Sequence, residues 1–199
     1  MEILYTLFSL LLVFVIINVI RIKRNVAHFF NYFAERYNKR MHARKKVLFE
    51  GLNQMMAQRG DGKLVILEVG SGSGANFEFF PPGSDVICLD PNRHFKKILL
   101  NNVRKFSGIR VLEFYQGKVE NLRDFVATES VDAAVCTLVL CSVKDVARGL
   151  QEILRVLKPV GTHSRLRHRQ CCMAEPRPYS CGMFSYAYSG SQRLCMGCR

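Results

Sequence analysis

One short stretch limits the possible fold more than any other part of this 199-residue chain: Leu64 to Gly74, which reads LVILEVGSGSG. Its first four residues are apolar and uninterrupted, as in a strand that is buried on both faces of a parallel sheet. Glu68 follows, and glycine then occupies every second position, at Gly70, Gly72 and Gly74. Glycine permits sharp turns, positive φ and the close approach of a ligand to the backbone. The stretch therefore predicts a strand, a glycine loop and a helix start that together hold a nucleotide.

A second acidic residue stands where it can complete such a site. Asp85 to Asp90 (DVICLD) is another short apolar segment, and its last residue comes twenty positions after Gly70. A carboxylate at the end of the second strand can accept hydrogen bonds from both hydroxyls of a ribose. We expect Asp90 and Glu68 to lie at one edge of the sheet and to share a ligand. Capping of a helix that begins near Asn92 is a simpler role for Asp90, and the two roles are compatible.

The order of the glycines distinguishes two classes of nucleotide site. Dinucleotide-binding folds use G-x-G-x-x-G, in which a helix N-terminus faces a pyrophosphate. Here the pattern is E-x-G-x-G-x-G, with a carboxylate two residues before the first glycine. A carboxylate in that place suits a positively charged ligand better than a phosphate. A nicotinamide-dependent oxidoreductase is therefore the less favoured class.

The segments after the glycine loop alternate between helix and strand patterns. Helices are expected at 92–105 and 146–157, and further strands at 109–115 and 131–140. This alternation is typical of an α/β fold with a parallel sheet. The sequence therefore predicts a Rossmann-like domain over 61–160.

Taken in order, the motifs resemble those of the class I S-adenosylmethionine-dependent methyltransferases. They are E-x-G-x-G-x-G, LD, G-x-x-E-x-L, VD…CTLVLCSV and E-x-x-R-V-L-K-P. Within that class, the apolar N-terminus together with LEVGSGSGANF, FPPG, LDPN and CTLVLCSVK is most similar to the membrane-anchored thiol methyltransferases of the methyltransferase-like 7 group. The likeness covers roughly Met1 to Pro159. It implies an enzyme that moves a methyl group from S-adenosylmethionine to an alkyl thiol at the endoplasmic reticulum and lipid droplets.

The same resemblance implies a set of cofactor-binding residues. S-adenosyl-L-methionine carries a sulfonium and an ammonium but no phosphate, which agrees with an acid before the glycine loop. The residues expected to bind it are Glu68, Gly70, Gly72, Gly74, Asp90, Val119 and Cys136. Lys118 is expected beside Val119, along the adenine. A thiol substrate must lose its proton, but the sequence assigns no base or other catalytic residue.

The N-terminus has the composition of a membrane anchor. Ile3 to Ile20 is apolar and uncharged, and its 18 residues would rise about 27 Å as a helix, close to the ~30 Å of a hydrocarbon core. Glu2 precedes the segment, a basic cluster from Arg21 follows it, and no small-residue cleavage site is present, which disfavours a signal peptide. We expect an anchor with a basic, cytosolic flank over 1–24. Shallow insertion without crossing is the alternative.

An amphipathic helical linker is expected over 25–60. One helical face of it carries apolar residues at spacings of i, i+3, i+4, i+7 and i+11: Val26, Phe29, Phe30, Phe33 and Tyr37. This face either packs against the domain or lies on a lipid surface. The basic residues at 39–46 support the second interpretation, and both remain open.

The net charge of +13 raises the question of nucleic-acid binding. The basic residues are concentrated after the apolar segment, at 39–46 and in the tail, and no aromatic-plus-basic ribonucleoprotein motif is present. A basic flank beside a membrane segment faces anionic lipid headgroups. The distribution therefore favours membrane lipid over nucleic acid as a partner. The sequence does not predict an oligomeric state.

The composition changes abruptly at Gly161. From there on the chain has no Val, Ile, Lys or Asp, and it holds five of the eight cysteines. We expect an irregular Cys/Arg-rich tail over 161–199, as from a substituted terminus, and an incomplete sheet whose fourth strand is an exposed edge. Cys195 and Cys198 form a single C-x-x-C, which does not predict a metal site without a second pair.

These observations together predict a membrane-anchored, cytosol-facing thiol methyltransferase in a truncated form whose activity is impaired or absent. The alternative is a non-catalytic protein, targeted to membranes or lipid droplets, that retains a remnant of the cofactor-binding fold.

Overall fold

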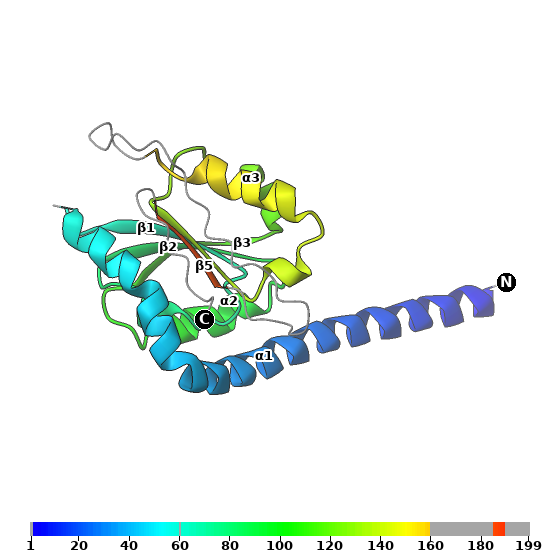
Figure 1. Ribbon diagram of the computed structural model, residues 1–199. Helices are drawn as coiled ribbons and strands as arrows, with labels where there is room; N and C mark the ends of the chain where they lie inside the picture. Colours follow the sequence, from blue (N-terminus) through cyan, green and yellow to red (C-terminus); the bar gives the residue numbers. More distant parts are fainter. Residues whose placement is uncertain (1, 60, 160–184, 190–199) are drawn as a thin grey trace, which may run out of the picture.

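The centre of the chain forms the parallel sheet that the sequence predicts (Figure 1). The computed structural model describes residues 2–59, 61–159 and 185–189. The parallel strands are β1 (Leu64–Val69), β2 (Ser84–Asp90), β3 (Arg110–Gln116) and β4 (Ala133–Thr137). They lie in the order β3-β2-β1-β4, so the strand that leads into the glycine loop is flanked on both sides. The Rossmann-like arrangement is confirmed.

Alternate side chains of β1 belong to two separate hydrophobic clusters. Leu64 and Ile66 pack on the face that is covered by α1, by the short helix η1 (Phe77–Phe79) and by α2 (Phe95–Val103). Leu67 and Val69 pack on the opposite face, against η2 (Val119–Asp124) and α3 (Val146–Val156). Burial on both faces explains why β1 is apolar at every position before Glu68.

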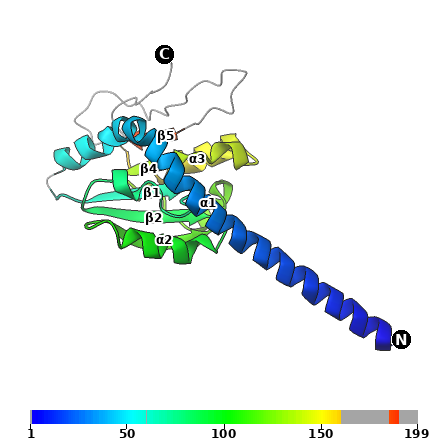
Figure 2. The same cartoon turned by 90° about the horizontal axis from the view of Figure 1, so that it is seen from below.

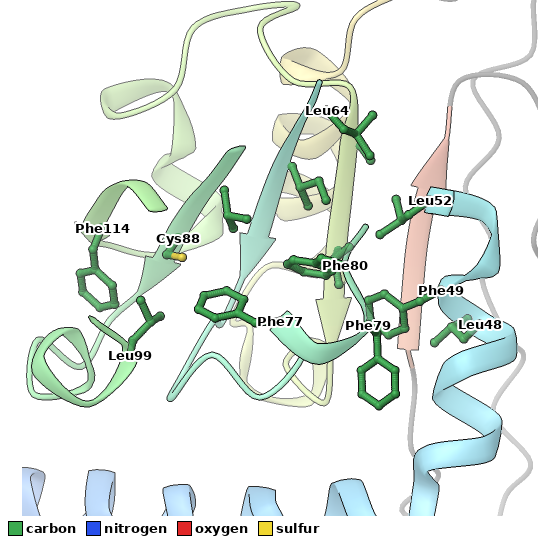
Figure 3. Close-up of a cluster of buried hydrophobic side chains, with 14 of the residues drawn as sticks. Leu48, Phe49, Leu52, Leu64, Phe77, Phe79, Phe80, Cys88, Leu99 and Phe114 are labelled. Atoms are coloured by element: carbon green, nitrogen blue, oxygen red, sulfur yellow. The ribbon is translucent and has the colours of Figure 1, made fainter. Parts of the chain in front are cut away.

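The first cluster is rich in aromatic rings, which connect the sheet to α1 (Figure 3). The ring of Phe49, from α1, lies 5.4 Å from that of Phe79 and 5.7 Å from that of Phe80. Leu48 and Leu52 are buried on the same face of the helix. Each such side chain contributes roughly 1.5–3 kcal/mol when it is fully buried. These contacts fix the second half of α1 to the domain.

Helix α1 (Glu2–Gln58) is continuous through the predicted anchor and linker. Its N-terminal part extends away from the domain (Figures 1 and 2). Contact with the domain begins near Lys23, whose carbonyl accepts from Asn92, and at Ala27, which is buried in the first cluster.

Phe29, Phe30 and Phe33 are 63%, 51% and 48% exposed. The three phenylalanines of the aromatic face are therefore exposed, which disfavours the first interpretation for this part of the face, whereas Tyr37 is partly buried beside Lys45. Among the described residues, no helix combines the length and hydropathy needed to cross a membrane.

The edge of β4 is paired, so the expectation of an exposed edge was wrong. β5 (Ser185–Ser189) lies antiparallel to β4, with Ala133 opposite Ser189 and Thr137 opposite Ser185. Strand pairing uses backbone groups, so a segment of unusual composition can still supply it. The alternation SYAYS, with aromatic residues at every second position, is compatible with a strand. The remainder of the tail, including Cys195 and Cys198, lies outside the described residues.

Asp132 ties the amino end of the sheet to the segments on both sides of it. Its Oδ2 accepts a hydrogen bond from the backbone N–H of Val65 at 2.8 Å. Its Oδ1 lies 2.9 Å from Nζ of Lys158 and 2.5 Å from Nη1 of Arg59. Burial opposes ionisation of this carboxyl, but the hydrogen bonds from Val65, Lys158 and Arg59 outweigh it, and the pKa of Asp132 is lowered.

Replacing Asp132 with asparagine is expected to lower the free energy of unfolding by about 1–3 kcal/mol near pH 7, because Lys158 loses its carboxylate partner and Arg59 keeps only Asp61. A lowered pKa contributes stability above the ordinary value of 3.8, and this contribution is lost as the pH falls through the folded pKa. Urea denaturation should therefore show a smaller difference between variant and wild type near pH 3. The matched control is Asp124→Asn, at an exposed position. A difference that is equally large in acid would contradict the ionic role.

Candidate functional site

The glycine loop and the two acidic residues lie together at the carboxyl edge of β1 and β2, as predicted. Glu68 is opposite Cys88 in the register, and the backbone N–H of Gly70 donates to the carbonyl of Leu89 at 2.7 Å. Asp90 comes directly after Leu89 and is the last residue of β2. Because side chains alternate along a strand, Glu68 and Asp90 both leave the sheet on the face that α1 and α2 cover. Two carboxylates thus lie on the same face of neighbouring parallel strands.

Asp90 is held by the backbone of the loops around it. Its Oδ2 accepts from the N–H of Gly72 at 3.0 Å, and its Oδ1 accepts from the N–H of Asn92 at 2.8 Å. Burial raises the pKa of Asp90, and these two hydrogen bonds oppose the rise. Each carboxylate oxygen retains a further lone pair that can accept from a ligand. Asp90 therefore holds the two loops and keeps acceptor capacity, but it does not cap a helix as the simpler prediction states, because α2 begins at Phe95 with His94 as its N-cap.

Gly72 leaves the backbone of the loop open. It adopts a φ of +49°, and a Cβ built on it would lie no closer than 4.0 Å to any other group. Gly70 differs, because a Cβ there would lie 2.1 Å from the side chain of Val139. Gly74 is likewise packed, against the ring of Phe77. Of the three predicted glycines, Gly72 is the one where a ligand can approach the main chain.

Glu68 is buried, with 1% of its surface exposed. Oε1 accepts from Nδ2 of Asn76 at 2.7 Å. Oε2 has no hydrogen-bond partner within the described part of the chain. Burial raises the pKa of Glu68 to about 7, against the hydrogen bond from Asn76 and the charge of Lys45, while the charge of Asp90 adds to the rise. A buried carboxylate with a free oxygen is an unsatisfied group that suits a cationic ligand.

A lysine that the sequence did not predict, Lys45, lies close to Glu68. Lys45 of α1 is 5% exposed, and its Nζ donates to Oδ1 of Asn76 at 2.7 Å and to Oδ1 of Asn38 at 2.6 Å. Burial lowers the pKa of Lys45 to about 8, although the charges of Glu68 and Glu78 oppose this. One signal could have identified it. Lys45 precedes the apolar pair at 48 and 49 by three and four positions, and so lies on the buried face of the helix.

Val119 and Cys136 reach the same edge of the sheet on its other face. Cys136 is opposite Val69 in the register, and both Cys136 and Val119 are buried in the cluster that α3 covers. Burial raises the pKa of Cys136 to about 12, so its thiol stays protonated. Lys118 lies just before η2, in extended conformation. These residues are near the loop but do not join Glu68 and Asp90 in one side-chain cluster.

A cavity of about 440 Å³ lies on the α1 side of the glycine loop. Asn38 and His42 of α1, Ala75 of the loop and Asn102 of α2 contribute to its walls. Neither Glu68 nor Asp90 lines it, so we place the candidate site at the strand edge, where the carboxylates are, and not in this cavity. Within the described ranges no group of three or more His, Cys, Asp or Glu could hold a metal ion.

Comparison with known proteins identifies related sequences. Residues 67–164 match a family model described as a methyltransferase domain. The chain is 44% identical over 132 residues to thiol S-methyltransferase TMT1A of Homo sapiens, an alignment that covers 66% of this chain and 53% of that protein. It is 42% identical over 124 residues to thiol S-methyltransferase TMT1B of Homo sapiens, covering 62% and 50%. The chain thus spans about half the length of these relatives.

A solved structure has a fold similar to that of this chain. The crystal structure of the CurJ carbon methyltransferase matches with a TM-score of 0.50 at 14% identity, over 59% of this chain and 32% of that one. At this identity the likeness concerns the fold alone.

The burial of Glu68 leads to a prediction about how stability depends on pH. Because the pKa of Glu68 is raised from its ordinary 4.5 to about 7, the folded chain keeps a proton that the unfolded chain has lost. This group therefore contributes stability at low pH and loses it as the pH rises from about 4.5 to about 7, by at most about 1.4 kcal/mol per pH unit. Glu68→Gln is expected to remove this slope in urea denaturation at stepped pH. Glu50→Gln, at an exposed position, should retain it. A wild-type slope in Glu68→Gln would refute the assignment.

Proposed function

We propose that this chain is a class I S-adenosylmethionine-dependent methyltransferase of the thiol S-methyltransferase kind, and that it transfers a methyl group to an alkyl thiol at a membrane surface. The proposal rests on one observation: Glu68, Gly72 and Asp90 lie together at the carboxyl edge of β1 and β2. The thiol as acceptor comes from the names of the relatives.

The residues at this edge fit the charges of S-adenosyl-L-methionine. Its sulfonium and ammonium need anionic neighbours, and Glu68 Oε2 is a buried acceptor that lacks a partner among the described residues. The free lone pairs of Asp90 suit ribose hydroxyls, and the open backbone at Gly72 permits close approach. When bound, the cofactor supplies an electrophilic methyl group on sulfur.

The contribution of the chain is to bind and to orient. Holding an acceptor in line with a bound donor removes much of the entropic barrier of a two-molecule reaction. The reacting sulfur must be a thiolate. Burial raises the pKa of Cys88 and that of Cys136, so neither supplies one. We therefore assign the sulfur that accepts the methyl group to the substrate, as the names of the relatives indicate.

Isothermal titration of the full chain with S-adenosyl-L-methionine tests the site. Asp90→Ala removes the acceptors for two hydroxyls and is expected to weaken binding roughly 10–100-fold, because hydrogen bonds to a charged group contribute about 1.5–3 kcal/mol each. Glu113→Ala, at an exposed position on β3, is the matched control and should bind like wild type. Equal binding by Asp90→Ala and wild type would overturn the site assignment.

The alternative function is a membrane-targeted protein without catalysis. A chain that is folded by circular dichroism but gives no heat with the cofactor would favour it. Transfer of a labelled methyl group to hexanethiol in the presence of phospholipid vesicles would exclude it. The same assay determines whether the methyltransferase activity of this chain, which spans about half of its relatives' length, is impaired.

Membrane attachment is the second part of the proposal. The first half of α1 exposes large apolar side chains along its length, including Leu11, Phe14, Ile17 and Ile20. Such a surface is unfavourable in water, and it extends away from the domain (Figure 2). Basic residues from Arg21 to Arg24 and at 39–46 would face anionic headgroups. We propose the cytosolic face of the endoplasmic reticulum and the lipid droplet as locations, by family resemblance.

Flotation with vesicles of phosphatidylcholine and phosphatidylserine tests attachment. Leu11→Asp with Phe14→Asp places two charges in the apolar segment and is expected to reduce the bound fraction more than tenfold. The control is Leu112→Asp, at an exposed apolar position on β3. A double variant that floats like wild type would refute the role of this segment. Protection of an N-terminal tag from added protease would distinguish crossing of the bilayer from shallow insertion.

A further inference from the structure

The buried Lys45 connects helix α1 to the candidate cofactor site. We propose that Lys45 is a positioning residue for Glu68: through Asn76 it holds this carboxylate in place, and its charge favours the ionised form that would face the positive charge of the cofactor. The inference rests on the proposed function, because it assumes that Glu68 faces that cofactor. It adds a residue of α1 to a site that otherwise consists of the glycine loop and the strand ends.

The geometry of Asn76 makes the connection specific. Its Oδ1 accepts from Lys45 at 2.7 Å, while its Nδ2 donates to Oε1 of Glu68 at 2.7 Å and to Oγ1 of Thr137 at 2.9 Å. Both hydrogens of the amide nitrogen are therefore used, and a rotated amide would place a donor against the ammonium. Asn76 is fixed in one orientation, which directs Oε1 of Glu68 toward it and leaves Oε2 free.

The charges around Glu68 explain why a cation is needed. Among the described residues whose charge acts on Glu68, Asp90 disfavours its ionised form and Lys45 is the cation that favours it. The other titratable groups near the pair on this face of the sheet are Glu78 of η1, Cys88 of β2, and Tyr37 and His42 of α1. Cys136 of β4 lies within range of the Glu68 charge from the other face. Without Lys45, burial and the charge of Asp90 would drive Glu68 to its neutral form. A neutral carboxyl offers little to a cationic ligand.

Lys45 is in turn held firmly by its surroundings. Its Nζ donates to Asn38, whose own Nδ2 donates to Oε1 of Glu78 at 2.8 Å. The rings of Tyr37 and Phe79 lie 5.3 and 5.5 Å from the same nitrogen. The ammonium therefore reaches the site only while the second half of α1 is packed on the domain. The helix that we propose attaches to lipid thus also carries a part of the cofactor site.

Titration of Glu68 in the full chain, in detergent micelles and without cofactor, tests the inference directly. Carbon-13 NMR of the glutamate carboxyls reports its midpoint, and the signal is assigned by its loss in Glu68→Gln. In Lys45→Met we expect the midpoint to rise by about one pH unit or more. Lys45→Arg, which keeps the charge, should bring the midpoint most of the way back to wild type. The matched control is Lys46→Met at the next, exposed position, which should leave the midpoint unchanged.

Cofactor titration provides the second measurement. In Lys45→Met, binding of S-adenosyl-L-methionine near pH 7 is expected to weaken about fivefold if the Glu68 midpoint rises by one pH unit from about 7, and about tenfold for each further unit. Binding should approach wild type above pH ~8, where Lys45 itself loses its charge. A Glu68 midpoint equal to wild type, or tighter binding by Lys45→Met, would overturn the proposal. The second result would mean that Lys45 repels the cofactor. If wild type binds no cofactor, the proposed function fails, while the NMR titration still decides the relation between Lys45 and Glu68.

Discussion

A carboxylate buried at the end of β1 is the constraint on which the rest of the site depends. Glu68 is removed from water, so its ionised form exists only if charges or hydrogen bonds compensate for the lost solvation. Asn76 supplies one hydrogen bond, and Lys45 supplies a charge. The parallel pairing of β1 with β2 then brings Asp90 to the same edge. Together these contacts leave an anionic site with unused acceptors beside an open backbone.

Helix α1 has two different surfaces, and each suits a different environment. Its first half is apolar and exposed, while its second half buries Phe49 and Leu52 against the aromatic cluster of the domain. In the second half, Lys45 lies on the buried face and shares the environment of these apolar residues. A lysine is costly there unless its ammonium has hydrogen-bond partners, and the amide oxygens of Asn38 and Asn76 accept from two of its three donors.

Local patterns in the sequence were sufficient to predict the strand, the loop and the acid at its edge, because each depends on neighbouring residues. The strand expected at 131–140 instead ends at Thr137, since Leu138 adopts a φ of +58° that no strand continues. Lys45 could not be paired with Asn76 from sequence, since 31 positions separate them. β5 was missed because the composition of the tail outweighed a five-residue alternation. The missed features all depend on contacts between distant segments.

The charge balance of the site indicates how a ligand would affect the fold. Burial disfavours the ionised forms of both Glu68 and Asp90, the charge of Asp90 adds to the effect on Glu68, and the charge of Lys45 opposes it. A cationic ligand would add the missing positive charge, lower the pKa of Glu68 and remove the cost of its unpartnered oxygen. Such a ligand binds the folded state alone, so it stabilises that state by mass action. The contact between a cationic ligand and Glu68 would therefore both bind the ligand and remove the energetic cost of burying this carboxylate.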